Sequence, residues 1–201
     1  MIAIVTGAAQ GIGEAIARRL HADGYEVALA DIADAELVAS DLGDGARAHA
    51  LDVRDLDSWE RLLAGLDGDV YALVNNAART EFRSFWEIEV DEWDDVLATN
   101  LRGTYLGCRT VGHALRERGR GRIVNLASDA AFAASGGSGV HYAASTAGVV
   151  AVTRRAATEL APHGVTVNAV APAAIVAFLL SADAGYITGA TLDVNGGVVM
   201  R

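Results

Sequence analysis

The chain has 201 residues, 52% of them hydrophobic, and a formal net charge of −10 at pH 7. This length favours one domain with a continuous core over residues 1–201, and the acidic balance argues against nucleic acid or an anionic membrane surface as a partner. No apolar run reaches the roughly 18–20 residues that a membrane-spanning helix needs, so no membrane association is expected.

The cysteine and histidine content limits the kinds of site and the cellular location that we expect. The single cysteine, Cys108, excludes an internal disulfide framework and favours a reducing, cytoplasmic location, where we expect it to be a small buried side chain. The five histidines are scattered, so no metal site is expected. The chain begins with an apolar strand, so we expect no secretory or transit peptide. All 16 basic residues are arginine, and the chain contains no lysine.

The first predicted element is a buried parallel strand, Ile2-Ala3-Ile4-Val5. It leads into Thr6-Gly7-Ala8-Ala9-Gln10-Gly11-Ile12-Gly13, after which apolar residues recur at helical spacing. A strand that turns through glycines into a helix leaves backbone N–H groups unpaired at the helix start, where they and the helix dipole suit a phosphate. In this interpretation Gly7 permits the tight turn, Gly11 lets a ligand approach the backbone, and Gly13 lets the helix pack close to the strand. The alternative is a glycine turn without a ligand.

The remaining elements alternate along the chain. Further strands are expected at Tyr25–Ala30, Arg47–Leu51, Val70–Val74, Arg122–Leu126, Val165–Val170 and Gly189–Val194. Helices are expected at Ala33–Ser40, Leu56–Leu66, Asp91 or Asp94 to Arg118, and Val140–Ala161. This order predicts an α/β fold: a Rossmann-like, doubly wound parallel sheet of about seven strands with helices on both faces, in three layers. Ligands of such sheets bind outside the carboxyl ends of the strands.

Polar residues fall at those strand ends. Asp31 follows the second strand, 18 residues after Gly13, close to the spacing of about 20 for a carboxylate that accepts hydrogen bonds from an adenosine ribose. Such a carboxylate repels a 2′-phosphate, so it favours NAD over NADP; the alternative is a surface turn aspartate followed by Ile32. Inside the long helix, Asn100 lies on an otherwise apolar face, where an unpaired amide costs roughly 1–3 kcal/mol. We therefore expect Asn100 to have specific hydrogen-bond partners.

Together these residues resemble the short-chain dehydrogenases/reductases over nearly the whole chain. The resemblance is carried by Thr6-Gly7-Ala8-Ala9-Gln10-Gly11-Ile12-Gly13, Asn75-Asn76-Ala77, Asn100, Asn125-Leu126-Ala127-Ser128, Tyr142 and Val167-Asn168-Ala169-Val170-Ala171-Pro172. Several independent motifs in the same order are more specific than the glycines alone. The resemblance implies an NAD-dependent oxidoreductase that interconverts a secondary alcohol and a ketone by hydride transfer.

The resemblance also implies roles for individual residues. It implies a cofactor held by Gly7, Gln10, Gly11, Ile12 and Gly13 at the pyrophosphate, by Asp31 and Ile32 at the ribose, by Asp52 and Val53 at the adenine, and by Asn75, Ala77, Tyr142, Pro172 and Ile175 further along. In the catalytic group it implies that Tyr142 exchanges a proton with the substrate oxygen and Ser128 hydrogen-bonds that oxygen. It also implies that Asn100 holds the helix backbone open for a proton-relaying water. Taken singly, Tyr142 could be an ordinary aromatic residue and Ser128 a loop hydroxyl.

The first departure from the family's pattern is a missing positive charge. The family places a lysine four residues after the tyrosine, whereas the chain reads Tyr142-Ala143-Ala144-Ser145-Thr146, with Thr146 in that catalytic position. A free phenol titrates near pH 10, and a nearby cation lowers its pKa toward the working pH. Thr146 offers a hydroxyl to the nicotinamide ribose but no charge. Since an acid–base group contributes roughly 10²–10⁴ in rate, we predict strongly reduced turnover with cofactor binding largely retained. His141 is a poor substitute base, because neighbouring helical residues point in different directions.

The second departure follows Pro172. Family members continue with a mobile segment that covers the substrate, whereas Pro172-Ala173-Ala174-Ile175 here runs directly into an apolar segment at 176–183. We therefore expect a deletion of this lid near residues 175–176, which opens the site to water and makes substrate selectivity poor; the alternative is a flexible stretch omitted from the sequence. Ala78 and Arg79 are smaller departures, because a glycine usually follows Asn-Asn-Ala.

Other functional classes stay open. A non-catalytic NAD-binding or scaffold protein is favoured by Thr146 and the missing lid, and opposed by the retained catalytic side chains. A nucleotide-sugar epimerase is weaker, because such chains usually carry a longer C-terminal region. The two long helices are apolar over more than one face, which favours a homodimer or homotetramer over helices buried within a monomer. The small-molecule alcohol or ketone substrate is not identified by the sequence.

Overall fold

The computed structural model describes residues 1–132, 138–171 and 175–194. Within this part of the chain the strands are β1 (Ile2–Thr6), β2 (Glu26–Asp31), β3 (Ala46–Ala50), β4 (Val70–Asn75), β5 (Gly121–Leu126), β6 (Val165–Ala171) and β7 (Thr191–Asp193). The α-helices are α1 (Gly11–Ala22), α2 (Glu36–Leu42), α3 (Leu56–Ala64), α4 (Val90–Leu97), α5 (Gly103–Arg118), α6 (Val140–Leu160) and α7 (Val176–Leu180). A π-helical turn, η1 (Ala98–Arg102), and 3-10 turns η2 (Asp129–Ala131), η3 (Ala161–His163) and η5 (Ala182–Ala184) complete the list.

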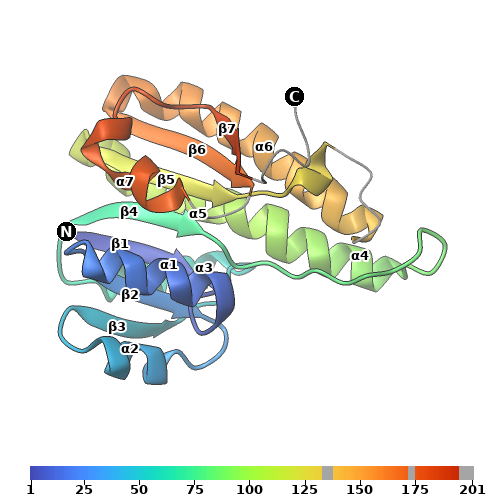
Figure 1. Ribbon diagram of the computed structural model, residues 1–201, viewed down its shortest axis with the longest axis horizontal. Helices are drawn as coiled ribbons and strands as arrows, with labels where there is room; N and C mark the ends of the chain where they lie inside the picture. Colours follow the sequence, from blue (N-terminus) through green and yellow to red (C-terminus); the bar gives the residue numbers. More distant parts are fainter. Residues whose placement is uncertain (133–137, 172–174, 195–201) are drawn as a thin grey trace.

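The strands form one parallel sheet in the order β3-β2-β1-β4-β5-β6-β7 (Figure 1). The first three strands extend the sheet in one direction from β1, and the later strands extend it in the other. The strand order therefore reverses between β1 and β4, and the crevice at that point is where doubly wound sheets bind ligands. The prediction of a parallel, doubly wound sheet of about seven strands is confirmed.

Helices cover both faces of the sheet, because alternate strand residues point to opposite sides and both sides are apolar. Ile4 and Leu73 belong to a core cluster with residues of α3, α5 and α6. Their neighbours Val5 and Val74 belong to a second cluster with residues of α1, α2 and α7. The three predicted layers are therefore present, with the central strands buried between two apolar clusters.

Two of the differences between predicted and observed element bounds have a local cause. The helix expected from Ala33 begins at Glu36, because the carboxylates of Asp31 and Asp34 accept the backbone N–H groups of Ala33 and Glu36, each 2.8–2.9 Å away, and so stabilise turns before the helix. The last strand is shorter than expected, because Gly189 has a φ of +71°, which is incompatible with an extended strand. Among the described residues, no helix combines the length and the apolar character needed to cross a bilayer.

Candidate functional site

The segment between β1 and α1 has the geometry expected of a phosphate-binding loop. Gly7 and Gly11 adopt φ values of +66° and +62°, which side chains disfavour. The space around Gly11 is open, whereas a Cβ on Gly13 would lie 2.0 Å from the Gly7 carbonyl oxygen. The cap residue Gln10 makes no side-chain hydrogen bond to the first N–H groups of α1. Those donors remain available to a ligand, and Gly13 acts through packing rather than contact.

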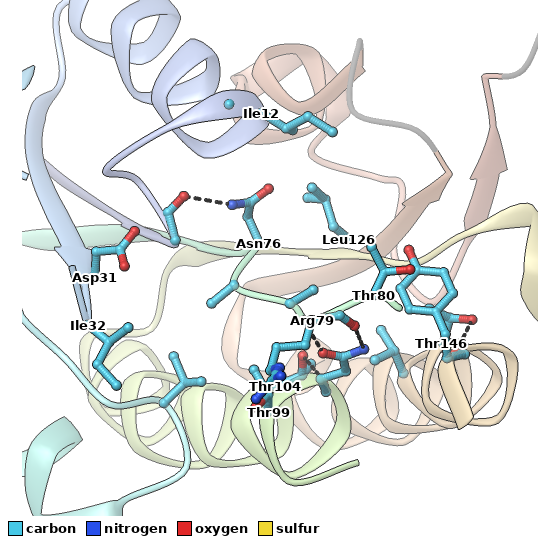
Figure 2. Close-up of a pocket in the computed structure, with 18 of the residues that line it drawn as sticks. Ile12, Asp31, Ile32, Asn76, Arg79, Thr80, Thr99, Thr104, Leu126 and Thr146 are labelled. Atoms are coloured by element: carbon cyan, nitrogen blue, oxygen red, sulfur yellow. Dashed lines mark hydrogen bonds between the residues drawn. The ribbon is translucent and has the colours of Figure 1, made fainter. Parts of the chain in front are cut away.

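This loop opens onto a cleft of about 1110 Å³ at the carboxyl ends of the strands. Its lining includes Ile12, Asp31, Ile32, Ser128, Tyr142 and Thr146. Figure 2 shows Asp31 and Ile32 at one end and Thr146 at the far end, with Asn76 between them. Residues at the ends of β1 to β5 and residues of α1, η1, α5 and α6 thus share one cavity.

Asp31 connects the end of β2 to the glycine segment. Its Oδ2 accepts the backbone N–H of Ala9 at 2.9 Å, and its Oδ1 accepts that of Ala33 at 2.9 Å. An ionised carboxylate has about four acceptor positions, so this side chain retains capacity for ribose hydroxyls. The arrangement fits an adenosine ribose, because the same residue shapes the loop and faces the cleft.

The placement of Asn75 corrects one expectation. Its side chain is buried behind the cleft, where its Nδ2 donates to Asn125 Oδ1 at 2.8 Å, and it does not line the cavity. The neighbour Asn76 faces the glycine segment instead and donates to the carbonyl oxygens of Thr6 at 2.9 Å and Gly7 at 3.1 Å. Strand alternation is the reason, since Asn75 shares its face with Leu73 toward α5. This alternation along β4 can be read from the sequence, and it predicts that Asn75 and Asn76 point to opposite faces.

Cys108 lies in the same buried polar cluster as Asn75. It is a buried, free thiol within 3.6–3.7 Å of the amide groups of Asn75 and Asn125. Burial raises its pKa to about 12. The expectation of a small buried side chain is therefore confirmed, and the thiol is unreactive near neutral pH.

Asp52 and Val53 line the cleft after β3, but the Asp52 carboxylate is already paired. Arg54 contacts both of its oxygens through Nε and Nη2 at 2.8–3.2 Å, and that side-chain hydrogen bonding lowers the pKa of Asp52. Arg54 also donates to Asp95 of α4 at 2.7 Å. The carboxylate thus belongs to an ion-pair network at the cleft wall, which the sequence motif did not indicate.

Arg79, at the family's glycine position, continues that network. Its guanidinium pairs with Asp95 and, at 2.7 Å, with Glu81. These hydrogen bonds and charges raise the pKa of Arg79, with the Glu81 bond as the largest cause. Both arginines that line the cleft in the described part of the chain are therefore held by carboxylates.

Asn100 lies in the π-helical turn η1 that divides the long predicted helix into α4 and α5. Its Oδ1 accepts the backbone N–H of Arg79 at 2.7 Å, and its Nδ2 donates to the Arg79 carbonyl at 2.9 Å and to Ser145 Oγ at 3.0 Å. The expected specific partners of this amide are therefore present. Single π-turns often occur at functional sites, and this one locks the segment after β4 against α6.

Tyr142 and Thr146 lie one turn apart on α6 and both line the cleft. The Thr146 hydroxyl donates to the carbonyl oxygens of Tyr142 and Ala143, both at 3.1 Å, and the side chain is only 4% exposed. It therefore supplies neither charge nor a long reach into the cavity.

Buried His141 anchors the start of α6. Its Nδ1 accepts the backbone N–H of Tyr142 at 2.9 Å, and its Nε2 lies 3.0 Å from Glu92 Oε1 on α4. Because Nδ1 is an acceptor, the ring proton is on Nε2 and is donated to Glu92. A Cβ on Gly139 would lie 2.3 Å from the His141 ring, so the chain needs a glycine there. This structural role agrees with the low expectation for His141 as a base.

Pro172 and Ile175 are also predicted to contact the cofactor. Pro172 lies outside the described residues. Ile175 does not line the cleft and packs instead against the apolar cluster of α1 and α7, because it directly precedes the buried face of α7 at Val176 and Leu179.

Known proteins resemble this chain in sequence. A family profile described as short chain dehydrogenase matches residues 1–183. The 3-oxoacyl-[acyl-carrier-protein] reductase FabG of Haemophilus influenzae is 34% identical over 238 residues, which cover 99% of this chain and 98% of that protein. Nodulation protein G of Azospirillum brasilense is 35% identical over 240 residues, covering 98% of this chain and 97% of that protein.

Solved structures agree with the sequence relatives. A short chain dehydrogenase from Mycobacterium smegmatis has a TM-score of 0.92 at 30% identity, covering 98% of this chain and 92% of that chain. A 3-oxoacyl-[acyl-carrier protein] reductase from Brucella melitensis with bound NAD also has a TM-score of 0.92, at 31% identity, covering 100% of this chain and 91% of that chain. The protein described here therefore belongs to the short-chain dehydrogenase family of oxidoreductases, which act on CH–OH or keto groups.

Proposed function

We propose that this protein interconverts a secondary alcohol and a ketone with NAD(H), at a rate limited by Thr146. The observation that carries the proposal is a single cleft lined by the glycine loop, by the Asp31 carboxylate, and by Ser128 and Tyr142. The pyrophosphate would be held by the backbone of Gly11 and Ile12 and by the positive end of α1.

The described residues fit the dinucleotide. Gly7 and Gly11 hold conformations that leave the backbone accessible, and Asp31 lies beside the loop with acceptor capacity for ribose hydroxyls. The charge of Asp31 disfavours a 2′-phosphate, which supports NAD as the cofactor. When bound, the nicotinamide ring supplies or accepts the hydride. The structural relative from Brucella melitensis binds NAD, which supports the same assignment.

In the proposed mechanism, this chain's own side chains handle the proton and orient the substrate. Tyr142 exchanges the proton of the substrate oxygen, and Ser128 hydrogen-bonds that oxygen. Asn100 holds the π-turn and the segment after β4, and thus the backbone through which a water relays protons. Thr146 places no positive charge beside the phenol, so we expect this proton exchange to be slow.

We also propose that the substrate lid is deleted near residues 175–176. In support, the region of the Haemophilus influenzae reductase that aligns here spans 238 residues, whereas this chain has 201. Ile175 leads directly into α7, which is packed in the core. An uncovered site admits water and makes fewer substrate contacts, which would relax selectivity.

A non-catalytic NAD-binding protein is the second candidate. One observation favours it: the hydroxyl of Thr146 is committed to the backbone of its own helix, so the residue gives the phenol no electrostatic support. Both candidates predict NAD binding, and they differ in turnover.

The test replaces Thr146 by lysine. NAD binding is measured by titration of the native chain, Thr146→Lys and Thr146→Gln, where glutamine supplies a long side chain without charge. Oxidation of a panel of secondary alcohols is then followed by NADH absorbance. We expect all three proteins to bind NAD and Thr146→Lys to turn over roughly 10²-fold faster than Thr146→Gln.

The possible outcomes separate the two candidates. Equal rates for the lysine and glutamine variants would show that the missing charge does not limit turnover. NAD binding without oxidation of any alcohol by any of the three proteins would favour the non-catalytic candidate. Absence of NAD binding would contradict both.

A further inference from the structure

The residue after Ser128 is an aspartate whose carboxylate lies in the same cleft. Ser128 Oγ and Asp129 Oδ1 are 3.1 Å apart, and both residues line the cavity together with Tyr142. Asp129 is the first residue of η2 and is only partly buried. The sequence motif ends at Ser128 and gave no role to its neighbour.

The hydrogen-bond chemistry fixes the orientation of the Ser128 hydroxyl. An ionised carboxylate can only accept, so the Ser128 proton points to Asp129. The backbone N–H of Ala130 donates to Ser128 Oγ at 3.2 Å and occupies one of its two lone pairs. One acceptor position remains on Ser128, and it is suited to a donor such as the hydroxyl of an alcohol. A ketone oxygen, which only accepts, would require the hydroxyl to turn away from Asp129.

We propose that Asp129 is a proton acceptor acting through Ser128, and that it partly replaces the cation missing at Thr146 in alcohol oxidation. The inference rests on the proposed alcohol–ketone chemistry. The alcohol O–H bond breaks and its proton passes to Ser128 Oγ, while the Ser128 proton passes to the Asp129 carboxylate. The C–H bond breaks in the same oxidation, and its electron pair leaves as hydride to the oxidised nicotinamide dinucleotide, giving the ketone. Asp129, partly exposed, then releases its proton to water.

This route differs from proton exchange through Tyr142 in one decisive respect. It needs no cation at residue 146, because the Asp129 carboxylate itself takes up the proton. The two routes are therefore alternatives for the same proton. Activating the phenol with a lysine should make the Asp129 route less important.

A double-mutant comparison tests this proposal. Asp129→Asn keeps a side-chain oxygen that accepts the Ser128 hydroxyl but cannot take up its proton. We expect this change to lower alcohol oxidation roughly 10-fold or more in the native chain. In the Thr146→Lys background we expect a loss within about 3-fold, because coupled groups are not additive. Asp129→Glu, which keeps the carboxylate, should retain part of the native rate.

Two further measurements separate a proton acceptor from a merely structural residue. Acetate added to Asp129→Ala should raise its oxidation rate with increasing acetate concentration, because a free carboxylate can enter the vacated space. NAD binding, measured by titration, should be the same in the native chain and in Asp129→Asn. Asp183→Asn, the same chemical change at an exposed residue of η5, is the matched control and should leave oxidation unchanged.

The results that overturn the inference are distinct from those that overturn the proposed function. An equal fold-loss for Asp129→Asn in both backgrounds, no rescue by acetate, or NAD binding weakened as much as turnover would each show a structural role. If neither the native chain nor Thr146→Lys oxidises any alcohol, the proposed function fails and the inference fails with it.

Discussion

Some side chains that line the cleft also make hydrogen bonds that hold neighbouring segments in place. Asp31 holds the glycine segment through Ala9 and also faces the cavity, and Asn100 locks the segment after β4 through both atoms of its amide. Thr146, by contrast, is satisfied within its own helix. Asp31 therefore has a structural contact and a proposed role in binding, and both are affected when it is substituted.

Asp31→Asn should weaken NAD binding and relax discrimination against NADP. The amide keeps one oxygen for the N–H of Ala9 but loses the charge that strengthens the ribose hydrogen bonds and repels a 2′-phosphate. Hydrogen bonds to charged groups contribute about 1.5–3 kcal/mol, so the Kd for NAD should rise roughly 10- to 100-fold. Titrations with NAD and NADP measure both effects, and an unchanged ratio of the two dissociation constants would contradict the assignment.

At the scale of elements, the first turn of α6 is attached to α4. Glu92 and His141 form a buried contact whose other end is the backbone N–H of Tyr142. Glu92 is also paired with Arg83 in the segment that follows β4, at 3.3 Å. The contact therefore fixes α6, which carries Tyr142, relative to the wall of the cleft. Tyr142 is the proposed proton donor.

His141→Ala should lower the free energy of unfolding by about 1–3 kcal/mol, because it leaves buried polar groups without partners. Glu92→Gln keeps an oxygen acceptor for Nε2 and should cost less. Denaturant unfolding measures both free energies. Glu117→Gln, at an exposed glutamate of α5, is the control and should have little effect. Equal, near-zero effects of His141→Ala and the control would refute the anchoring role.

At the scale of the whole molecule, ion pairs link segments that are distant in the sequence. Arg54 connects the segment after β3 to α4, and Asp95 connects α4 to Arg79 after β4. The strand order places the ends of these segments around one cleft. Global stability should therefore respond to protonation of this network.

For Asp52, the direction in which stability changes with pH follows from its pKa. Hydrogen bonding from Arg54 lowers the pKa of Asp52 in the folded protein below the ordinary value of about 3.9. The resulting stabilisation is fully present above the unfolded-state pKa and is lost as the pH falls through the lower, folded-state pKa. The stability difference between the native chain and Asp52→Asn should therefore shrink below about pH 4. Denaturant unfolding at several pH values measures it, and a constant difference would show that Asp52 does not contribute this pH dependence.

The local features of this protein can be predicted from its amino-acid sequence. Strand periodicity, the glycines at the β1–α1 junction and the spacing to Asp31 depend on residues close in the chain, so they predicted the parallel sheet and the phosphate-binding geometry. The division of the long helix at Asn100 was less accessible, because it depends on what packs against that turn.

Which charged side chains form ion pairs depends on the packing of the whole chain. The pairs Arg54–Asp95 and Glu92–His141 join residues more than 40 positions apart, and no local pattern records such contacts because the sheet order brings their segments together. The same holds for the cleft itself, which is assembled from the ends of β1 to β5 and from residues of α1, η1, α5 and α6. The orientation of Ser128 toward Asp129 is an intermediate case: the residues are neighbours, but the backbone of η2 decides that their side chains meet.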